Sequence, residues 1–167
     1  MAIELVKERY SNAINVVEIG RPGASPIKVG GETTLPFLFG EGGMPHAPVT
    51  VLEILDREPM DWPESLREPF GEAIKDPIRW AKAAVEKFGS KLLCVRLQSV
   101  HPGYGNRSSE ESVSVLETIA KEVKVPLIVV GCGDDDKDND LLPKASQALK
   151  GENCLFGIAT QENYKTL

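Results

Sequence analysis

Short apolar runs alternate with stretches of helical periodicity from residue 48 onward. The runs are rich in β-branched residues and are bounded by Pro, Gly or Asp, which is typical of buried strands. They cover residues 49–55, 92–97, 126–130 and 154–159. Parallel strands need a crossover connection, so this strand and helix alternation predicts a parallel sheet with helices packed outside it.

Three helix starts and stops can be read from the residues between the runs. Asp76, followed by a proline, supplies an N-cap for a helix that ends at Gly89. Ser108 and Glu111 have the spacing of a capping box for the second helix. The third helix is predicted to begin in an acidic stretch and to end at Gly151.

Two architectures fit this order of elements. One is an open doubly wound sheet, and the other is the first half of a TIM (β/α)8 barrel, which needs about 250 residues to close. Thr160 has the character of another helix N-cap and lies close to Leu167, the last residue. We therefore favour residues 48–167 as the N-terminal half of an α/β barrel, with about four βα units and an incomplete last helix, from a truncated product or a split chain.

The first 47 residues follow a different pattern. Residues 15–19 and 27–29 flank a turn that is rich in proline and glycine, which predicts a hairpin. Residues 30–43 are glycine-rich at both ends but lack the glycine spacing of phosphate-binding loops. The predicted domains are thus residues 1–47, a hairpin with a connecting segment, and residues 48–167.

Composition and charge exclude several classes of partner. The formal net charge is −6, with 19 basic residues among 25 acidic ones, so no nucleic-acid-binding surface is expected. No apolar stretch approaches the roughly 20 residues of a membrane-spanning helix, and the N-terminus lacks the apolar core of a signal peptide. We expect a cytoplasmic protein. Its three widely spaced cysteines are too few for a four-cysteine iron–sulfur cluster or zinc site.

The strand at residues 92–97 has an unusual polar face. Alternate residues of a strand share a face, and the apolar face should meet the helices. Cys94, Arg96 and Gln98 would then point into a barrel interior or a cleft. Glu53 on the neighbouring strand could pair with Arg96, because a lone buried charge is costly. The pattern favours an ion pair that fixes strand register over the alternative, which is a polar floor under a ligand.

The loops after the carboxyl ends of the strands form the expected ligand-binding edge in both architectures. Their hydrogen-bonding side chains include His101, Tyr104, Asn106, Arg107, Asp134, Gln161 and Asn163. The sequence shows no nucleophile with its base among them, so a catalytic triad is not predicted. The two histidines, His46 and His101, lie close to prolines, which indicates exposed turns more than metal ligands or general bases.

The acidic segment GCGDDDKDND, residues 131–140, raises the question of a metal site. An EF-hand loop counted from Asp134 would need glutamate at its twelfth position, where this chain has Ala145. We therefore predict that the acids begin a helix, where they interact favourably with its dipole. The candidates for the cap are Asp136, Asp138 and Asn139. Replacing Asp138 or Asp140 by asparagine is then expected to cost little beyond helix stability.

Several segments resemble a known family. They are GGETTLPFLFGEG, DWPESLREPFGEAIKDPIRWAKAAVEKFG, HPGYGNRSSEE, VPLIVVGCGDDDKDNDLLPKA and GENCLFGIATQENYKT. Together they span about Tyr10 to Leu167 and look like the delta, or small, subunit of the corrinoid iron–sulfur protein of the CO dehydrogenase/acetyl-CoA synthase system. The resemblance implies a TIM barrel, similar in fold to pterin-dependent methyltransferases, of which this chain would supply half.

The resemblance also implies a cofactor and partners. A corrinoid (cobalamin) would lie between this non-catalytic subunit and a large gamma subunit that carries the iron–sulfur cluster. The cobalt would receive a methyl group from a methyl-tetrahydropterin or methyl-tetrahydrofolate and pass it to acetyl-CoA synthase, so a methyltransferase and the synthase would bind transiently in the reductive acetyl-CoA (Wood-Ljungdahl) pathway. The residues expected to face the corrinoid are His101, Asn106, Arg107, Cys132, Gly133, Asp134, Thr160, Gln161 and Asn163.

Two further functions stay open at this point. The chain could be a stand-alone pterin-dependent methyltransferase, because the fold is shared and Asp and Asn side chains at strand ends suit a pterin. It could also be an inactive barrel fragment. A half barrel exposes apolar faces that the missing strands should cover, so we also consider a homodimer of the half barrel.

Overall fold

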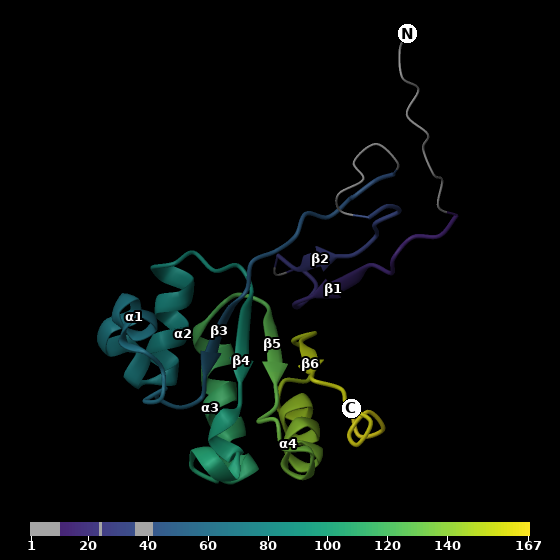
Figure 1. The fold of residues 1–167 in the computed structure, drawn as a ribbon. Helices are drawn as coiled ribbons and strands as arrows, with labels where there is room; N and C mark the ends of the chain where they lie inside the picture. Colours follow the sequence, from purple (N-terminus) through teal and green to yellow (C-terminus); the bar gives the residue numbers. More distant parts are fainter. Residues whose placement is uncertain (1–10, 24, 36–41) are drawn as a thin grey trace. The chain divides into compact units, whose positions relative to one another are not determined.

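The computed structural model of the protein describes residues 11–23, 25–35 and 42–167 (Figure 1). The strands are β1 (Val17–Ile19), β2 (Ile27–Val29), β3 (Leu52–Leu55), β4 (Leu93–Arg96), β5 (Leu127–Val130) and β6 (Leu155–Gly157). The α-helices are α1 (Glu64–Arg67), α2 (Pro77–Glu86), α3 (Ser109–Glu122) and α4 (Asp135–Ala148), and the 3-10 helices are η1 (Glu68–Lys75), η2 (Gln98–Val100) and η3 (Pro102–Tyr104). The chain forms two compact units, the first with Ile27–Val49 and the residues up to Glu18, and the second with Ile19–Pro26 and Thr50–Leu167.

β1 and β2 pair in a two-stranded sheet, at the places where the hairpin strands were predicted. The chain leaves β2 through Gly30, which has a φ of +90°. A Cβ at this position would lie 2.1 Å from the carbonyl oxygen of Asn15, so only glycine fits here. Residues 36–41 of the predicted connecting segment lie outside the described residues, and the domain boundary at residues 47 and 48 stays a prediction.

β3, β4, β5 and β6 form a parallel sheet in the order in which they occur in the chain. Leu93 lies opposite both Leu52 and Leu127, and Ile128 lies opposite Leu155. The four predicted strands of the α/β alternation are therefore confirmed. Each strand is shorter than the apolar run that predicted it, because the residues at the ends of the run do not pair with a neighbouring strand.

The caps of the first two predicted helices are confirmed. At the start of α2 the carboxylate of Asp76 accepts a hydrogen bond of 2.8 Å from the N–H of Arg79. At the start of α3, Ser108 and Glu111 form the full capping box, in which each side chain accepts from the backbone of the other residue. Both contacts satisfy N–H groups that have no partner inside the helix.

The cap of the third helix was predicted wrongly. Asp134, and none of the three later residues that were proposed, caps α4 by accepting from the N–H of Lys137 at 3.1 Å. The helix begins at Asp135, at least two residues earlier than the proposed caps required, so the proposed residues already have helical geometry and cannot take the extended conformation of an N-cap.

The segment between β3 and α2 contains α1 and η1. Apolar packing attaches this segment to α2. Trp62 and Phe70 meet the buried Trp80 edge to face, with ring centroids 5.6 and 5.5 Å away. Such aromatic pairs contribute about 0.5–1.5 kcal/mol beyond the area they bury.

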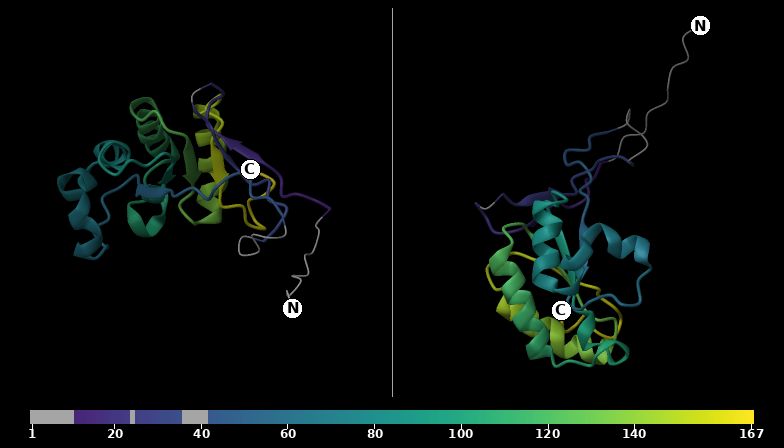
Figure 2. Two further views of the ribbon diagram at one scale, coloured as in Figure 1. Left: turned by 90° about the horizontal axis from the view of Figure 1, so that it is seen from above. Right: turned by 90° about the vertical axis from the view of Figure 1, so that its left-hand side faces the viewer.

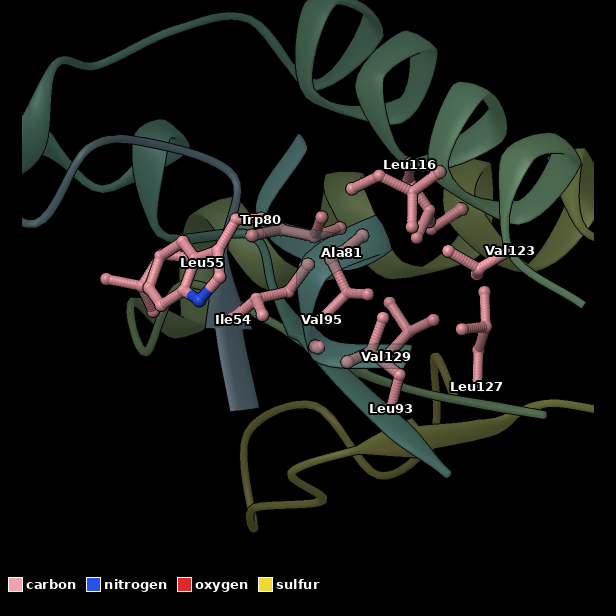
Figure 3. Close-up of a cluster of buried hydrophobic side chains, with 14 of the residues drawn as sticks. Ile54, Leu55, Trp80, Ala81, Leu93, Val95, Leu116, Val123, Leu127 and Val129 are labelled. Carbon is pink, nitrogen blue, oxygen red and sulfur yellow. The ribbon is translucent and has the colours of Figure 1, made fainter. Parts of the chain in front are cut away.

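The helices α2, α3 and α4 lie on one face of the four-stranded sheet (Figure 2). This arrangement follows from the strand order, because right-handed crossovers between consecutive neighbouring strands place every helix on the same side. The core between the two layers is fully buried (Figure 3), and its central side chains are Ile54, Trp80, Leu93, Val95, Leu116 and Val129. Burying each large apolar side chain contributes about 1.5–3 kcal/mol.

Candidate functional site at the carboxyl edge of the sheet

The carboxyl ends of the four parallel strands bring four loops to one edge of the sheet. The loops begin at Asp56, Leu97, Gly131 and Ile158. Each of them is held by a polar side chain that bonds backbone groups or neighbouring loops. These internal contacts decide which predicted site residues face outward.

Asp56 is the centre of a buried hydrogen-bond cluster at the end of β3. Only 1% of it is exposed. Its carboxylate accepts from the N–H of Ser99 at 2.8 Å, from the Ser99 hydroxyl, and from the hydroxyl of Ser112 at 2.7 Å. These bonds join β3 to the loop after β4 and to the first turn of α3. Sequence reasoning did not select Asp56, although an acid directly after a buried strand was a visible signal.

We expect Asp56→Asn to lower the free energy of unfolding by about 1–2 kcal/mol. The amide oxygen can still accept a hydrogen bond, but the amide NH2 is itself a donor and would face a group that donates to the carboxylate in the native protein. Chemical denaturation followed by circular dichroism measures the change. Glu58→Gln, two residues later on the same loop, is the control and should change stability by less than about 0.5 kcal/mol. Equal effects of the two substitutions would contradict this role of Asp56.

Arg57 joins the loops that follow β3 and β4. Its guanidinium donates to the side chains of Gln98 at 2.9 Å and Asp61 at 2.8 Å, and it lies 4.3 Å from the centre of the Tyr104 ring. The ring of His101 in turn lies 5.3 Å from that of Tyr104, and its Nδ1 accepts from the N–H of Gly103. The bond from Arg57 holds the pKa of the Asp61 carboxyl below its usual value. His101 is thus fixed on the loop as one part of a stack.

Asp138 holds the loop after β5, which contains the predicted residues Cys132 and Gly133. Only 4% of Asp138 is exposed, and its carboxylate accepts from the N–H groups of Cys132 at 2.7 Å and Gly133 at 3.0 Å. A Cβ at Gly131 would lie 2.4 Å from this carboxylate, so the loop closes tightly around it. Asp138 was expected only to help begin the helix, but it is buried and its carboxylate holds the loop after β5 against α4.

The last loop is organised by Thr160 and Asn163. The amide oxygen of Asn163, which is 1% exposed, accepts from the N–H of Thr160 at 2.7 Å, and its amide nitrogen donates to the carbonyl of Ile158 at 2.9 Å. The Thr160 hydroxyl donates to Asp135 at 2.8 Å and accepts from the N–H of Asn163. Both side chains therefore shape the loop and connect it to α4.

Four of the nine predicted residues face outward. The side chains of Asn106, Arg107 and Gln161 are exposed and have no hydrogen-bond partner among the described residues. Gly133 is exposed as well, and nothing lies within 4 Å of the position that a Cβ would take there. The other five, which are His101, Cys132, Asp134, Thr160 and Asn163, have side chains engaged in the loops.

The face of the sheet opposite the helices carries the predicted polar pair. The Nε and Nη2 atoms of Arg96 donate to the two carboxylate oxygens of Glu53, both at 3.0 Å, and the thiol of Cys94 lies 3.7 Å from the same carboxylate. The hydrogen bond to Glu53 raises the pKa of the Arg96 guanidinium. The pair links neighbouring strands in register, and its side chains are partly exposed on that face.

Burial raises the thiol pKa of Cys94 and of Cys132 to about 12. We expect both thiols to resist alkylation by iodoacetamide at pH 9 in the native protein and to react at once in denaturant, as read by mass spectrometry. In the unfolded chain the two thiols lose their protons near the ordinary pKa of 9.0, whereas in the native protein they keep them. The contribution of the two thiols to stability is therefore fully present below pH 9 and is lost progressively as the pH rises toward 12. Rapid native labelling of either thiol would contradict the burial.

In the part of the chain that the structure describes, no three His, Cys, Asp or Glu side chains come together as a metal site would require. No helix among the same residues has the length and apolarity that a membrane crossing demands.

Comparison with known proteins identifies the family. The family model of the CO dehydrogenase/acetyl-CoA synthase delta subunit matches residues 16–167. Three curated relatives, each named acetyl-CoA decarbonylase/synthase complex subunit delta, come from Archaeoglobus fulgidus (32% identical over 163 residues), Methanothermobacter thermautotrophicus (31% over 150) and Methanopyrus kandleri (33% over 137). The matches cover 94%, 90% and 81% of this chain but only 36%, 38% and 34% of the relatives. The chain therefore belongs to the family of CO dehydrogenase/acetyl-CoA synthase delta subunits.

Proposed function

We propose that this chain acts as the small subunit of a methyl carrier, in which it forms one wall of a corrinoid site and supplies no catalytic residue. One observation carries the proposal. At the carboxyl edge the buried polar groups fix the loops, while the side chains of Asn106, Arg107 and Gln161 are exposed and have no hydrogen-bond partner among the described residues. An edge built in this way leaves these side chains available to a group that binds from outside. The relatives' names describe subunits of a complex, which supports assembly with other subunits.

The exposed groups fit the periphery of a corrinoid, which carries amide side chains. Asn106 and Gln161 offer matching amides, Arg107 offers five N–H donors, and Gly133 leaves its backbone open to close approach. The five engaged residues would act through the backbone of the loops that they shape. A bound corrinoid would supply a cobalt that accepts a methyl group and passes it on, and this chain's residues would hold and shield the corrinoid ring.

We propose further that the sheet is the N-terminal half of a TIM barrel. Its strand order runs β3, β4, β5, β6 without the reversal that marks a doubly wound sheet. All three large helices lie on one face, as they do around a barrel. The Glu53 and Arg96 pair would then lie inside the barrel, beneath the edge where the loops gather.

The proposed partners follow from this role. A large gamma subunit would bring the corrinoid and the iron–sulfur cluster, and a methyltransferase and acetyl-CoA synthase would bind in turn. We place the protein in the cytoplasm, which the three free thiols support. Its net charge of −6 also favours protein partners over nucleic acid.

A stand-alone pterin methyltransferase finds less support. Such an enzyme needs carboxylate and amide groups at the strand ends to hold the donor and acceptor edge of the pterin. Here Asp56, Asp138 and Asn163 are at most 4% exposed, and each is occupied by internal hydrogen bonds. The polar residues at the strand ends therefore act on the protein's own loops.

Two assays separate these functions. In the first, the tagged chain is mixed with a corrinoid-loaded gamma subunit from this family, and stoichiometric retention on an affinity column is expected. In the second, the chain is incubated with methyltetrahydrofolate and free cob(I)alamin, and no methyl transfer above background is expected. Turnover without another subunit would overturn the proposal in favour of the methyltransferase.

A further inference from the structure

We propose that His101 is a specificity-determining residue of the carboxyl edge, whose Nε2–H donates a hydrogen bond to an amide carbonyl oxygen on the rim of the bound corrinoid. Arg57 is the positioning residue that holds the His101 ring in place through Tyr104. The inference rests on the proposed function, and it adds which atom of the bound group this chain recognises.

The backbone of His101 is fixed within the loop after β4. Its carbonyl oxygen accepts from the N–H groups of Tyr104 at 2.9 Å and Asn106 at 3.2 Å. The same loop is tied to the end of β3, because Ser99 donates to the buried carboxylate of Asp56. The fold itself therefore determines where the side chain of His101 begins.

The loop uses one ring nitrogen of His101, and the other is available. Nδ1 accepts a hydrogen bond of 2.9 Å from the N–H of Gly103. A neutral imidazole that accepts at one nitrogen carries its hydrogen on the other, so Nε2 is an N–H donor. Nε2 has no hydrogen-bond partner among the described residues, and the side chain is partly exposed. A group that binds beside this ring therefore meets a donor and must offer an acceptor.

Aromatic and cation–π contacts hold the ring of His101 from the neighbouring loop. The ring centroids of His101 and Tyr104 are 5.3 Å apart, and the guanidinium of Arg57 lies 4.3 Å from the centre of the Tyr104 ring. Arg57 is itself held by Gln98 at 2.9 Å and Asp61 at 2.8 Å, and only 13% of its side chain is exposed. Arg57 thus positions His101 through Tyr104, which contacts both.

An amide carbonyl is the acceptor that suits this donor. The rim of a corrinoid ring carries amide side chains, whose carbonyl oxygens accept hydrogen bonds. A neutral N–H pairs with a neutral carbonyl without burying a charge. The phosphate of a corrinoid nucleotide tail would instead be drawn to a guanidinium, which Arg107 exposes on the same loop. His101 therefore selects the carbonyl side of a rim amide.

The position of the ring hydrogen can be measured in the free chain. The protein has two histidines, His46 and His101, so a His46→Gln variant leaves one imidazole to record by 15N NMR. At about pH 8, above the ordinary titration range of imidazole, we expect Nε2 to be protonated and Nδ1 unprotonated. A hydrogen on Nδ1, or an even mixture of the two forms, would overturn the proposal. No corrinoid is present, so this result does not depend on the proposed function.

Two substitutions separate the loop bond from the donor. His101→Asn places an oxygen where Nδ1 lies, so it can keep the bond from Gly103, but it has no donor at the Nε2 position. His101→Gln carries an amide N–H to that position. In calorimetric titrations with the corrinoid-loaded gamma subunit, we expect His101→Asn to raise the Kd about tenfold and His101→Gln to stay within about threefold of the unsubstituted chain.

The outcomes distinguish this inference from the proposed function. A Kd for His101→Asn equal to that of the unsubstituted chain would overturn the inference and leave the proposed function in place. Equal losses for both variants would also overturn it, because the donor would then not matter. If the unsubstituted chain itself does not bind the gamma subunit, the proposed function fails and this inference fails with it.

A double substitution tests the positioning role of Arg57. We expect Arg57→Ala alone to raise the Kd about fivefold, and to cause no further rise when it is added to His101→Asn, because coupled residues give non-additive effects. Losses that multiply in the double variant would show that Arg57 does not act through His101 and would overturn its positioning role.

A shortened corrinoid identifies the acceptor. Cobinamide keeps the amides of the ring but lacks the nucleotide phosphate. A gamma subunit loaded with cobinamide should still bind the unsubstituted chain about tenfold more tightly than His101→Asn. Loss of this difference would assign the hydrogen bond to the phosphate and would overturn the amide carbonyl as its acceptor.

Discussion

Asp138→Ala should lower the free energy of unfolding by about 2–3 kcal/mol, because it leaves one buried and one partly buried N–H group without an acceptor, and a buried group without a partner costs about 1–3 kcal/mol. These are the N–H groups of Cys132 and Gly133, which donate hydrogen bonds of 2.7 and 3.0 Å to the carboxylate oxygens of Asp138. The loss should appear in denaturant titrations. Faster hydrogen exchange at the two amides should accompany it.

Asp136→Ala is the matched control, since Asp136 lies in the same first turn of α4 but is exposed. Its removal affects only the interaction with the helix dipole, which is about 0.3–1 kcal/mol. Similar losses of stability for the two variants, with no change in exchange at Cys132, would show that Asp138 is only another helix-starting acid.

The case of Asp138 shows how far the sequence could reach. The four strands, the caps at Asp76 and Ser108 and the Glu53 and Arg96 pair were predicted correctly, because each depends on a short local pattern or on strand alternation. The acids after β5 follow no such pattern. Which of the five aspartates caps the helix depends on the residue at which the helix begins, and the predicted start was at least two residues too late.

The candidate site was harder to predict for a related reason. Residues such as His101 and Asn163 were correctly placed in loops at the strand ends, but their side chains bond backbone groups of those same loops. Asp56 and Arg57 organise those loops, and they do so through contacts with residues about 40 positions later in the chain. Contacts of this range depend on the strand register, which the apolar pattern alone does not specify.

Gly133→Phe should weaken binding of the corrinoid-loaded gamma subunit by about tenfold or more, which corresponds to about 1.4 kcal/mol. The phenyl ring would project from the exposed loop after β5 into the space where the corrinoid is proposed to lie, since nothing fills that space now. Isothermal titration calorimetry with the loaded gamma subunit measures the loss. A smaller reduction is expected for Gly133→Ala, whose methyl group occupies little of that space.

Gly151→Phe provides a close control for the backbone. Gly151 has a φ of +94° against +92° at Gly133, is exposed, and also has no atom within 4 Å of a Cβ position. Both substitutions strain a left-handed residue by about 1–2 kcal/mol, so their effects on folding should match. Gly151 follows the carboxyl end of α4, away from the loops at the strand ends. Only Gly133→Phe should therefore weaken binding, and an equal loss for both variants would mean that the loop after β5 does not face the corrinoid.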